Sequence, residues 1–108
     1  MNTGKVILIP FPFAELTDIK VRPAVVVSKT RDKYEDLILC AVSSVVPKQL
    51  NSTEMLVTPS SLNRLRVSSV IKIDRLITLK KENVIADLGF LSPDQIDEFK
   101  IKFKQLVD

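Results

Sequence analysis

The chain consists largely of short apolar runs that follow one another closely, and this pattern restricts the fold more than any other feature. Each run is rich in Val, Ile or Leu and is bounded by Pro, Asp, Asn, Ser or Lys. Such runs predict β-strands joined by turns. The expected strands are residues 5–10, 23–28, 36–43, 54–58, 69–73, 76–79 and 84–88. Seven strands in 108 residues predict a small β-barrel or sandwich, in a single domain of residues 1–108.

The C-terminal segment has a different period, which predicts a helix. Ser92 is suited to the N-cap, Pro93 to the first helical position, and Gln95 to completing a capping box. Apolar residues then recur at spacings of three and four, at Ile96, Phe99, Phe103 and Leu106. A shorter helical turn is expected at residues 60–65, after Pro59.

The composition excludes several kinds of functional site. The chain has no histidine, and its one cysteine, Cys40, lies in an apolar run where a thiol is ordinarily a small hydrophobic side chain. Histidine-ligated metals and imidazole catalysis are therefore excluded, and we expect neither a metal ion nor another cofactor. Any catalysis must rest on arginine, lysine, carboxylates and hydroxyls.

The sequence also indicates where the protein acts. A single cysteine cannot form an internal disulfide, and no apolar run is long enough for a signal peptide core or a membrane span. We therefore expect a cytoplasmic protein with no membrane partner. The net charge of +3 and the isoelectric point of about 9.1 permit a nucleic-acid partner without requiring one.

Several motifs occur in an order that resembles the MazF/PemK toxin family of type II toxin-antitoxin systems. An apolar strand leads into Pro-Phe-Pro-Phe at residues 10–13, and a polar stretch then precedes Arg22-Pro23 and a valine-rich strand. Residues 38–44 are similar to the family strand that ends in Thr or Ser, and residues 69–76 are similar to its later strand. The resemblance covers essentially the whole chain.

This resemblance implies a mainly β fold with short helices, an SH3-like small barrel of the CcdB/MazF/PemK type with a C-terminal helix. It implies a homodimer that cleaves single-stranded RNA sequence-specifically without a metal ion. It also implies a cognate antitoxin protein whose tail occupies the RNA groove. One departure is the residue before the first strand, where the family usually has Asp and this chain has Lys5. That change is expected to remove a possible salt bridge.

The resemblance further implies two catalytic residues. The family's catalytic arginine falls on Arg22 and its catalytic Thr or Ser falls on Ser43. The planar fork of an arginine suits the phosphate charge that develops when a ribose 2′-hydroxyl attacks the adjacent phosphate. From the residues alone, an arginine before a buried strand is ordinarily a surface charge, and a serine at a strand end ordinarily makes a turn.

Four further residues are candidates for binding RNA: Phe13, Lys20, Ser44 and Lys72. An aromatic ring can stack on a base, and lysines can contact phosphates. Lys48, Arg64 and Arg66 are weaker candidates, because scattered cations are ordinarily solvated surface. The general base is left open, with Glu15 as one carboxylate that could move protons.

Two non-catalytic alternatives remain. A CcdB-like toxin shares the architecture and acts by protein contact, but that class ends in Trp-Gly-Ile, whereas this chain has no tryptophan and ends Leu106-Val107-Asp108. A degenerate relative would bind RNA or an antitoxin without cleaving, and Lys5 is the feature that points toward it. Arg22-Pro23 and Ser43 favour the nuclease.

Overall fold

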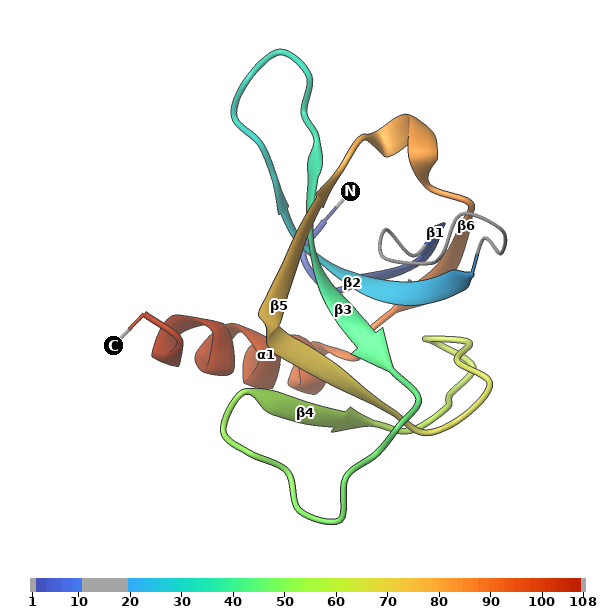
Figure 1. The fold of residues 1–108 in the computed structure, drawn as a ribbon, viewed down its shortest axis with the longest axis vertical. Helices are drawn as coiled ribbons and strands as arrows, with labels where there is room; N and C mark the ends of the chain where they lie inside the picture. Colours follow the sequence, from blue (N-terminus) through green and yellow to red (C-terminus); the bar gives the residue numbers. More distant parts are fainter. Residues whose placement is uncertain (1, 11–19, 108) are drawn as a thin grey trace.

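The computed structural model describes residues 2–10 and 20–107, whose main element is one six-stranded antiparallel sheet (Figure 1). The strands are β1 (Lys5–Pro10), β2 (Val21–Lys29), β3 (Leu37–Ser43), β4 (Glu54–Val57), β5 (Ser69–Leu79) and β6 (Ala86–Phe90). The 3₁₀ turn η1 (Lys81–Asn83) precedes β6, and helix α1 (Pro93–Gln105) follows it. The strand order is β4-β5-β3-β2-β1-β6, which with one C-terminal helix gives the expected mainly β fold.

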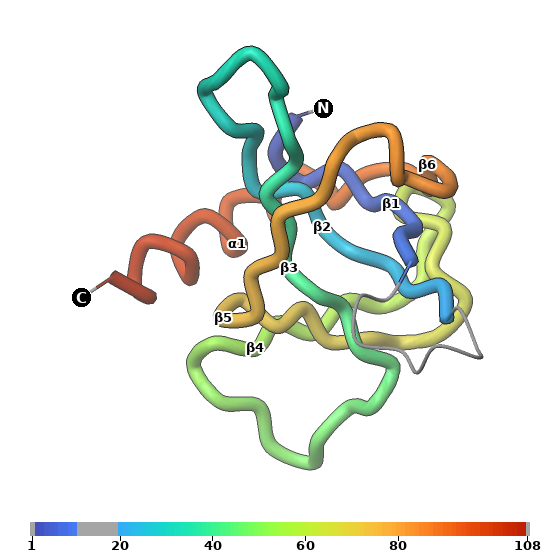
Figure 2. The backbone as a smooth tube through the Cα atoms, turned by 45° about the horizontal axis from the view of Figure 1, so that its top comes forward, coloured from blue at the N-terminus to red at the C-terminus, as the bar shows by residue number. Residues whose placement is uncertain are grey.

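Both faces of the sheet are buried, because alternating apolar residues of the central strands point into two cores. One core contains Val25, Val42 and Ile71 and is covered by α1, whose Phe99 is 1% exposed. The other core contains six buried residues, Ile7, Ile9, Ala24, Val26, Leu37 and Leu39. The sheet curls around this second core, and Figure 2 shows the chain returning from β5 to place β6 beside β1.

Two of the seven expected strands are the two halves of β5. At its centre the pairing with β3 shifts: Cys40 lies opposite Leu76, whereas the next residue, Ala41, lies opposite Lys72. Residues 73–75 therefore form a bulge with no partner on β3. The polar interruption in the sequence, which predicted a strand end, marks this bulge and the bend of β5 seen in Figure 1.

Two hydrogen bonds anchor the bulge. The backbone N–H of Ile73 donates to the carbonyl of Thr53 at 2.8 Å, and its own carbonyl accepts from Cys40 Sγ at 3.5 Å. Cys40 is fully buried, as predicted, and burial together with the charge of Asp74 raises the pKa of its thiol to about 12. The thiol is therefore a structural donor and not a reactive group.

Several other bounds differ from the expected ones by one or two residues, as in β2, which runs from Val21 to Lys29 and not from 23 to 28, and two departures have a visible cause. β6 begins at Ala86 and not at Val84, because Val84 closes the η1 turn through its N–H to Lys81 and packs on the second core. The expected helical turn at residues 60–65 is a single turn, closed by the Arg64 N–H on the Ser60 carbonyl at 2.9 Å. It extends no further, since Arg64 has a φ of +55°.

The predicted start of α1 is confirmed in detail. Ser92 Oγ accepts from the Gln95 N–H at 3.2 Å, and Gln95 Oε1 accepts from the Ser92 N–H at 2.8 Å, with Pro93 at the first position. The predicted apolar stripe faces the sheet, with Phe99 and Phe103 in ring contact at 6.4 Å between centroids.

The expected loss of a salt bridge at Lys5 is wrong. Lys5 Nζ lies 2.5 Å from a carboxylate oxygen of Asp87 on β6 and 4.0 Å from the ring centroid of Phe90. Only 14% of the Lys5 side chain is exposed, so the pair joins β1 to β6 at a partly desolvated position. The chain thus has an ion pair at this position with lysine as the cationic partner, which weakens the argument for a degenerate relative.

Candidate nucleic-acid interface

The pairing of β2 with β3 brings Arg22 and Ser43 to the same end of the sheet. Ala24 lies opposite Ala41 in this pairing, and Arg22 and Ser43 each lie two residues further along their strands. Alternate residues of a strand point to the same face, so both side chains belong to the face that carries Ala24 and Ala41. Both are half-buried.

A groove of about 610 Å³ lies at this end of the sheet, and we call it the Ser43 groove. It is lined by Arg22, Ala41, Val42, Ser43, Ser44, Val45, Lys72, Asp74, Arg75, Leu76 and Ile77. Two of its charged residues, Asp74 and Arg75, come from the β5 bulge and are exposed. The groove therefore combines three cations, one carboxylate and two hydroxyls.

A second groove of about 390 Å³ adjoins it, and we call it the Arg64 groove. It is lined by Leu8, Val21, Arg22, Pro23, Val42, Ser44, Arg64, Leu65, Arg66, Val67, Ser69 and Leu88. Arg22, Val42 and Ser44 line both grooves. Arg22 is therefore the cation that the Ser43 groove and the Arg64 groove have in common. A cation in this position could hold the centre of an anion that extends along both grooves.

The hydroxyl of Ser43 is oriented by the turn that follows β3. Its Oγ accepts a hydrogen bond from the Val45 N–H at 3.1 Å, which is the local backbone bond expected of a serine at a strand end. An oxygen that accepts from an amide still carries its own proton as a donor. Ser43 can therefore hold this turn and donate a hydrogen bond into the groove.

Lys72 reaches the Ser43 groove while paired with a buried carboxylate. Its Nζ donates to Glu54 Oε2 on β4, and the Glu54 side chain is only 6% exposed. The Asn51 N–H donates to the other oxygen at 2.9 Å. Together the Asn51 amide and Lys72 lower the pKa of Glu54 from its ordinary value of 4.5. The charge of Lys72 is thus partly offset, and its primary contact is structural.

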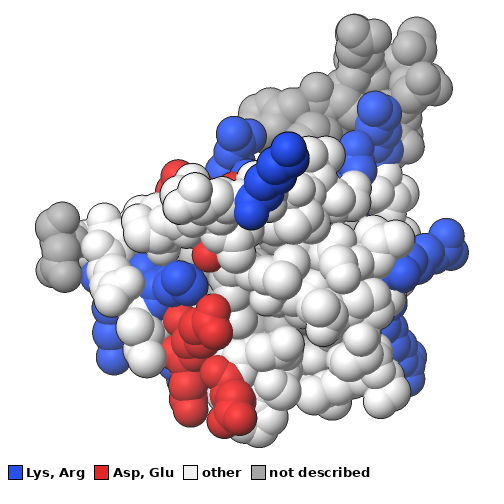
Figure 3. All heavy atoms as spheres, turned by 90° about the horizontal axis from the view of Figure 1, so that it is seen from below, with Lys and Arg blue, Asp and Glu red and all other residues white. Residues whose placement is uncertain are grey.

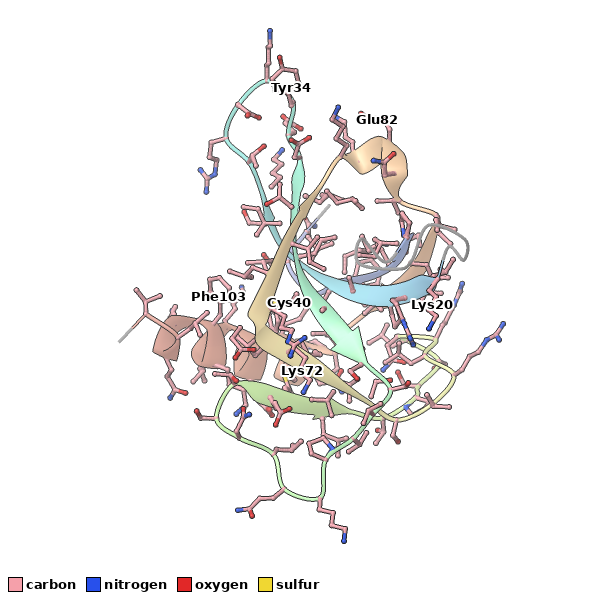
Figure 4. All side chains as sticks on the ribbon, in the orientation of Figure 1. Lys20, Tyr34, Cys40, Lys72, Glu82 and Phe103 are labelled. Atoms are coloured by element: carbon pink, nitrogen blue, oxygen red, sulfur yellow. The ribbon has the colours of Figure 1, made fainter. Side chains whose placement is uncertain are left out.

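The other residues that the sequence suggested are less closely associated with Arg22 and Ser43. Ser44 is exposed and lines both grooves. Lys20 is exposed just before β2, and Figure 4 places it at the outer end of that strand, away from Lys72 on β5. Phe13 and Glu15 lie outside the described residues.

Asp74 and Arg75 line the Ser43 groove although the sequence pattern did not predict it. Their charged pair interrupts an apolar run, which was read as a strand boundary. The same interruption is the available signal, because it coincides with the bulge, and bulges are over-represented next to active sites.

Neither a metal site nor a membrane helix is found in the part of the chain that the structure describes. No group of three or more Asp, Glu, Cys or His side chains comes together there as a set of metal ligands. No helix in residues 2–10 and 20–107 is long and apolar enough to cross a membrane.

Comparison with known proteins relates this geometry to a family. Residues 2–107 match the family model described as PemK-like, MazF-like toxin of type II toxin-antitoxin system. A search of curated protein sequences finds no match.

Solved structures show the same fold. An endoribonuclease from a mycobacterial species, in complex with its cognate antitoxin, superposes with a TM-score of 0.73 at 15% identity, over 99% of this chain and 94% of that one. MazF from Deinococcus radiodurans superposes with a TM-score of 0.70 at 22% identity, over 99% of this chain and 96% of that one. A further mycobacterial endoribonuclease superposes with a TM-score of 0.68 at 17% identity, over 99% of this chain and 93% of that one.

The Glu54 carboxylate should make the fold sensitive to acid. Its pKa is lowered in the folded chain, so its contribution to stability is present above pH 4.5 and is lost as the pH falls through the folded value. Glu54→Gln should therefore lower the melting temperature at pH 7, with a deficit that shrinks in acid. Glu82→Gln, at an exposed residue of η1, is the matched control and should melt as wild type at both pH values. A deficit that stays constant down to pH 3 would contradict this assignment.

Proposed function

Because the chain belongs to the PemK-like, MazF-like toxin family of type II toxin-antitoxin systems, we propose that it is a toxin that cleaves single-stranded RNA sequence-specifically without a metal ion. The observation that carries the proposal is the position of Arg22, which lines both grooves and shares the Ser43 groove with two hydroxyls, a carboxylate and two further cations. This combination supplies phosphate binding and proton transfer without imidazole or a metal.

The reaction is a transesterification within the RNA strand. The 2′-oxygen of one ribose forms a bond to the adjacent phosphorus, and the bond from phosphorus to the 5′-oxygen of the next nucleotide breaks. The products are a 2′,3′-cyclic phosphate and a free 5′-hydroxyl. Because the nucleophile belongs to the substrate, the protein contributes position, charge stabilisation and proton transfer.

Arg22 is the proposed donor to the phosphate. Its guanidinium can make two charge-assisted hydrogen bonds to the non-bridging oxygens, whose charge grows in the transition state. Ser43 is the proposed second donor, to a phosphate oxygen or to the departing 5′-oxygen, since its Oγ is already oriented by the Val45 amide.

Asp74 is the proposed proton acceptor for the 2′-hydroxyl. It is the one carboxylate among the described residues that line the Ser43 groove, and the bulge exposes it beside Arg75. The proton that it takes can return to the 5′-oxygen through solvent. Glu15, the carboxylate suggested from the sequence, lies outside the described residues and stays an untested alternative.

We extend the proposal to two protein partners, a second copy of the chain and a cognate antitoxin. The face seen in Figure 3 has a broad uncharged area, with lysine and arginine mostly toward its edges and an acidic cluster at its lower left. The loop after β3 and strand β4 expose apolar side chains, namely Val45, Val46, Leu50 and Leu56 at 76%, 41%, 37% and 45%. Such a patch is typical of a subunit interface. The cationic grooves would suit an acidic antitoxin segment.

The assembly should be visible in light scattering. The chain alone is expected at about twice its mass of 12.1 kDa at micromolar concentration, and Leu56→Asp is expected to shift it toward that single mass. The product of the adjacent reading frame, added to the wild-type dimer, should raise the mass further. A wild-type chain that remains a monomer would contradict the proposed assembly.

Cleavage should not depend on a divalent ion. The chain has no histidine, and the proposed donors are a guanidinium, a hydroxyl and a carboxylate. The single-turnover rate on a labelled single-stranded RNA should therefore be the same in excess EDTA as in magnesium. Activity that disappears with chelator and returns with magnesium would overturn the mechanism.

Arg22 and Ser43 should carry the rate. Arg22→Ala is expected to lower single-turnover cleavage by about 10²- to 10³-fold, the usual effect of removing one such donor. Arg22→Lys should recover little of this, because an ammonium lacks the bidentate fork. Ser43→Ala should reduce the rate clearly and Ser44→Ala less, which makes Ser44 the matched hydroxyl control.

Thermal melts establish that these variants fold. An Arg22→Ala chain that folds and cleaves at the wild-type rate would show that the site is wrongly assigned. A wild-type chain that binds RNA without cleaving it would favour the non-catalytic alternatives.

A further inference from the structure

The loop of residues 58–68, between β4 and β5, is held in one shape by a buried asparagine. Asn63 is 0% exposed. Its Oδ1 accepts from the N–H groups of Ser60 at 3.0 Å and Leu65 at 2.9 Å, and its Nδ2 donates to the Thr58 carbonyl at 2.9 Å. A side chain that satisfies three backbone groups replaces regular secondary structure within the loop. The loop is therefore preorganised.

The same loop is fixed against β6. The Leu62 carbonyl accepts from the Phe90 N–H at 3.0 Å. At Gly89, which has a φ of +154°, a Cβ atom would lie 1.9 Å from that carbonyl oxygen. Only glycine allows the backbone of the loop to approach β6 so closely. The position of the loop thus depends on Gly89.

This anchoring places two arginines at the groove that Arg22 shares. Arg64 has a φ of +55°, an uncommon conformation for a residue other than glycine, and the bonds of Asn63 on either side hold it. Arg64 and Arg66 are both exposed, and both line the Arg64 groove together with Arg22. Backbone strain that presents a charge at a groove suggests a functional position.

The lining of the Arg64 groove has a distinct chemistry. Its polar members are three arginines and two serines, with no acidic residue among the described residues that line it. The remainder is apolar, namely Leu8, Val21, Pro23, Val42, Leu65, Val67 and Leu88. An apolar surface with guanidinium groups around it suits a ligand with one flat apolar part and one anionic part. Its volume of about 390 Å³ is within the range of small-ligand sites.

We propose that the Arg64 groove binds the nucleotide next to the scissile phosphate, with its base against the apolar lining and its phosphate held by Arg64 and Arg66. This inference rests on the proposed function, because Arg22 connects the groove to the reacting phosphate. Arg64 and Arg66 are then binding residues for the RNA strand, and Asn63 and Gly89 are positioning residues that act through the loop.

The experiment compares three variants with a matched control. Arg64→Gly removes the guanidinium and suits the positive φ, so the loop should keep its shape. Arg66→Ala removes the second cation. The double variant, with Arg64→Gly and Arg66→Ala together, removes both. Arg31→Ala removes an equal charge at an exposed site on the β2–β3 hairpin, which Figure 1 shows on the far side of the molecule from the loop.

Two measurements are made on each protein. Fluorescence anisotropy with a fluorescein-labelled 2′-O-methyl single-stranded RNA, which cannot be cleaved, gives Kd over a range of salt concentrations. Single-turnover cleavage of the unmodified RNA of the same sequence gives the saturating rate and the half-saturating protein concentration.

The double variant is expected to raise Kd by roughly tenfold and to reduce the slope of log binding constant against log salt by about 0.7, because the one phosphate that the two arginines hold is no longer neutralised. The half-saturating concentration should rise in parallel, while the saturating rate changes much less. Gly89→Ala displaces the loop and should therefore also raise Kd, although both arginines are still present.

The outcomes separate this inference from the proposed function. A wild-type chain that binds the 2′-O-methyl RNA without cleaving the unmodified RNA contradicts the nuclease, and the Arg64 and Arg66 variants then still decide the groove. The groove assignment is overturned if the wild-type chain cleaves RNA and the double variant has the same Kd and salt slope as Arg31→Ala. A wild-type chain with no measurable affinity for the RNA overturns it as well.

Discussion

The bulge at residues 73–75 of β5 is the feature on which the rest of the architecture depends. It lets one strand pair with β3 in two registers, so its first half also pairs with β4 and its second half leads to η1 and β6. The resulting bend allows the sheet to curl around the second core while α1 covers the first. The same bulge exposes Asp74 and Arg75 in the Ser43 groove. Fold and candidate site therefore share one cause.

Buried contacts at Ile73 hold the bulge. Ile73 fills the core with 0% exposure, while its amide and carbonyl bond to Thr53 and to the Cys40 thiol. Among the described residues, no buried side-chain nitrogen or oxygen lacks a hydrogen-bond partner. An unsatisfied buried polar group would cost about 1–3 kcal/mol, and the bonds of the Ile73 amide and carbonyl avoid that cost at this residue.

The sequence predicted what local patterns determine. The bounds of β1 and the capping box of α1 were predicted correctly, because alternation and capping chemistry act over a few residues. The continuity of β5 was not predicted, since its bulge depends on contacts with Cys40 and Thr53, which lie far away in the sequence. Lys72 stays a candidate for binding RNA, and its pairing with Glu54, 18 residues distant, was not predicted because it has no local signal. Arg22 and Ser43 were placed by resemblance, and the strand pairing supplies the reason they lie at one end of the sheet.

The central claim is a reaction in which the ribose 2′-oxygen, and not water, attacks the phosphorus beside Arg22. The most direct test is the chemistry of the new RNA ends, determined by mass spectrometry of fragments from a defined single-stranded RNA. The expected products are a fragment that ends in a 2′,3′-cyclic phosphate and one that begins with a 5′-hydroxyl, with no cleavage when the scissile nucleotide carries 2′-deoxyribose. Fragments with a 3′-hydroxyl and a 5′-phosphate, or cleavage of the 2′-deoxy substrate, would contradict it.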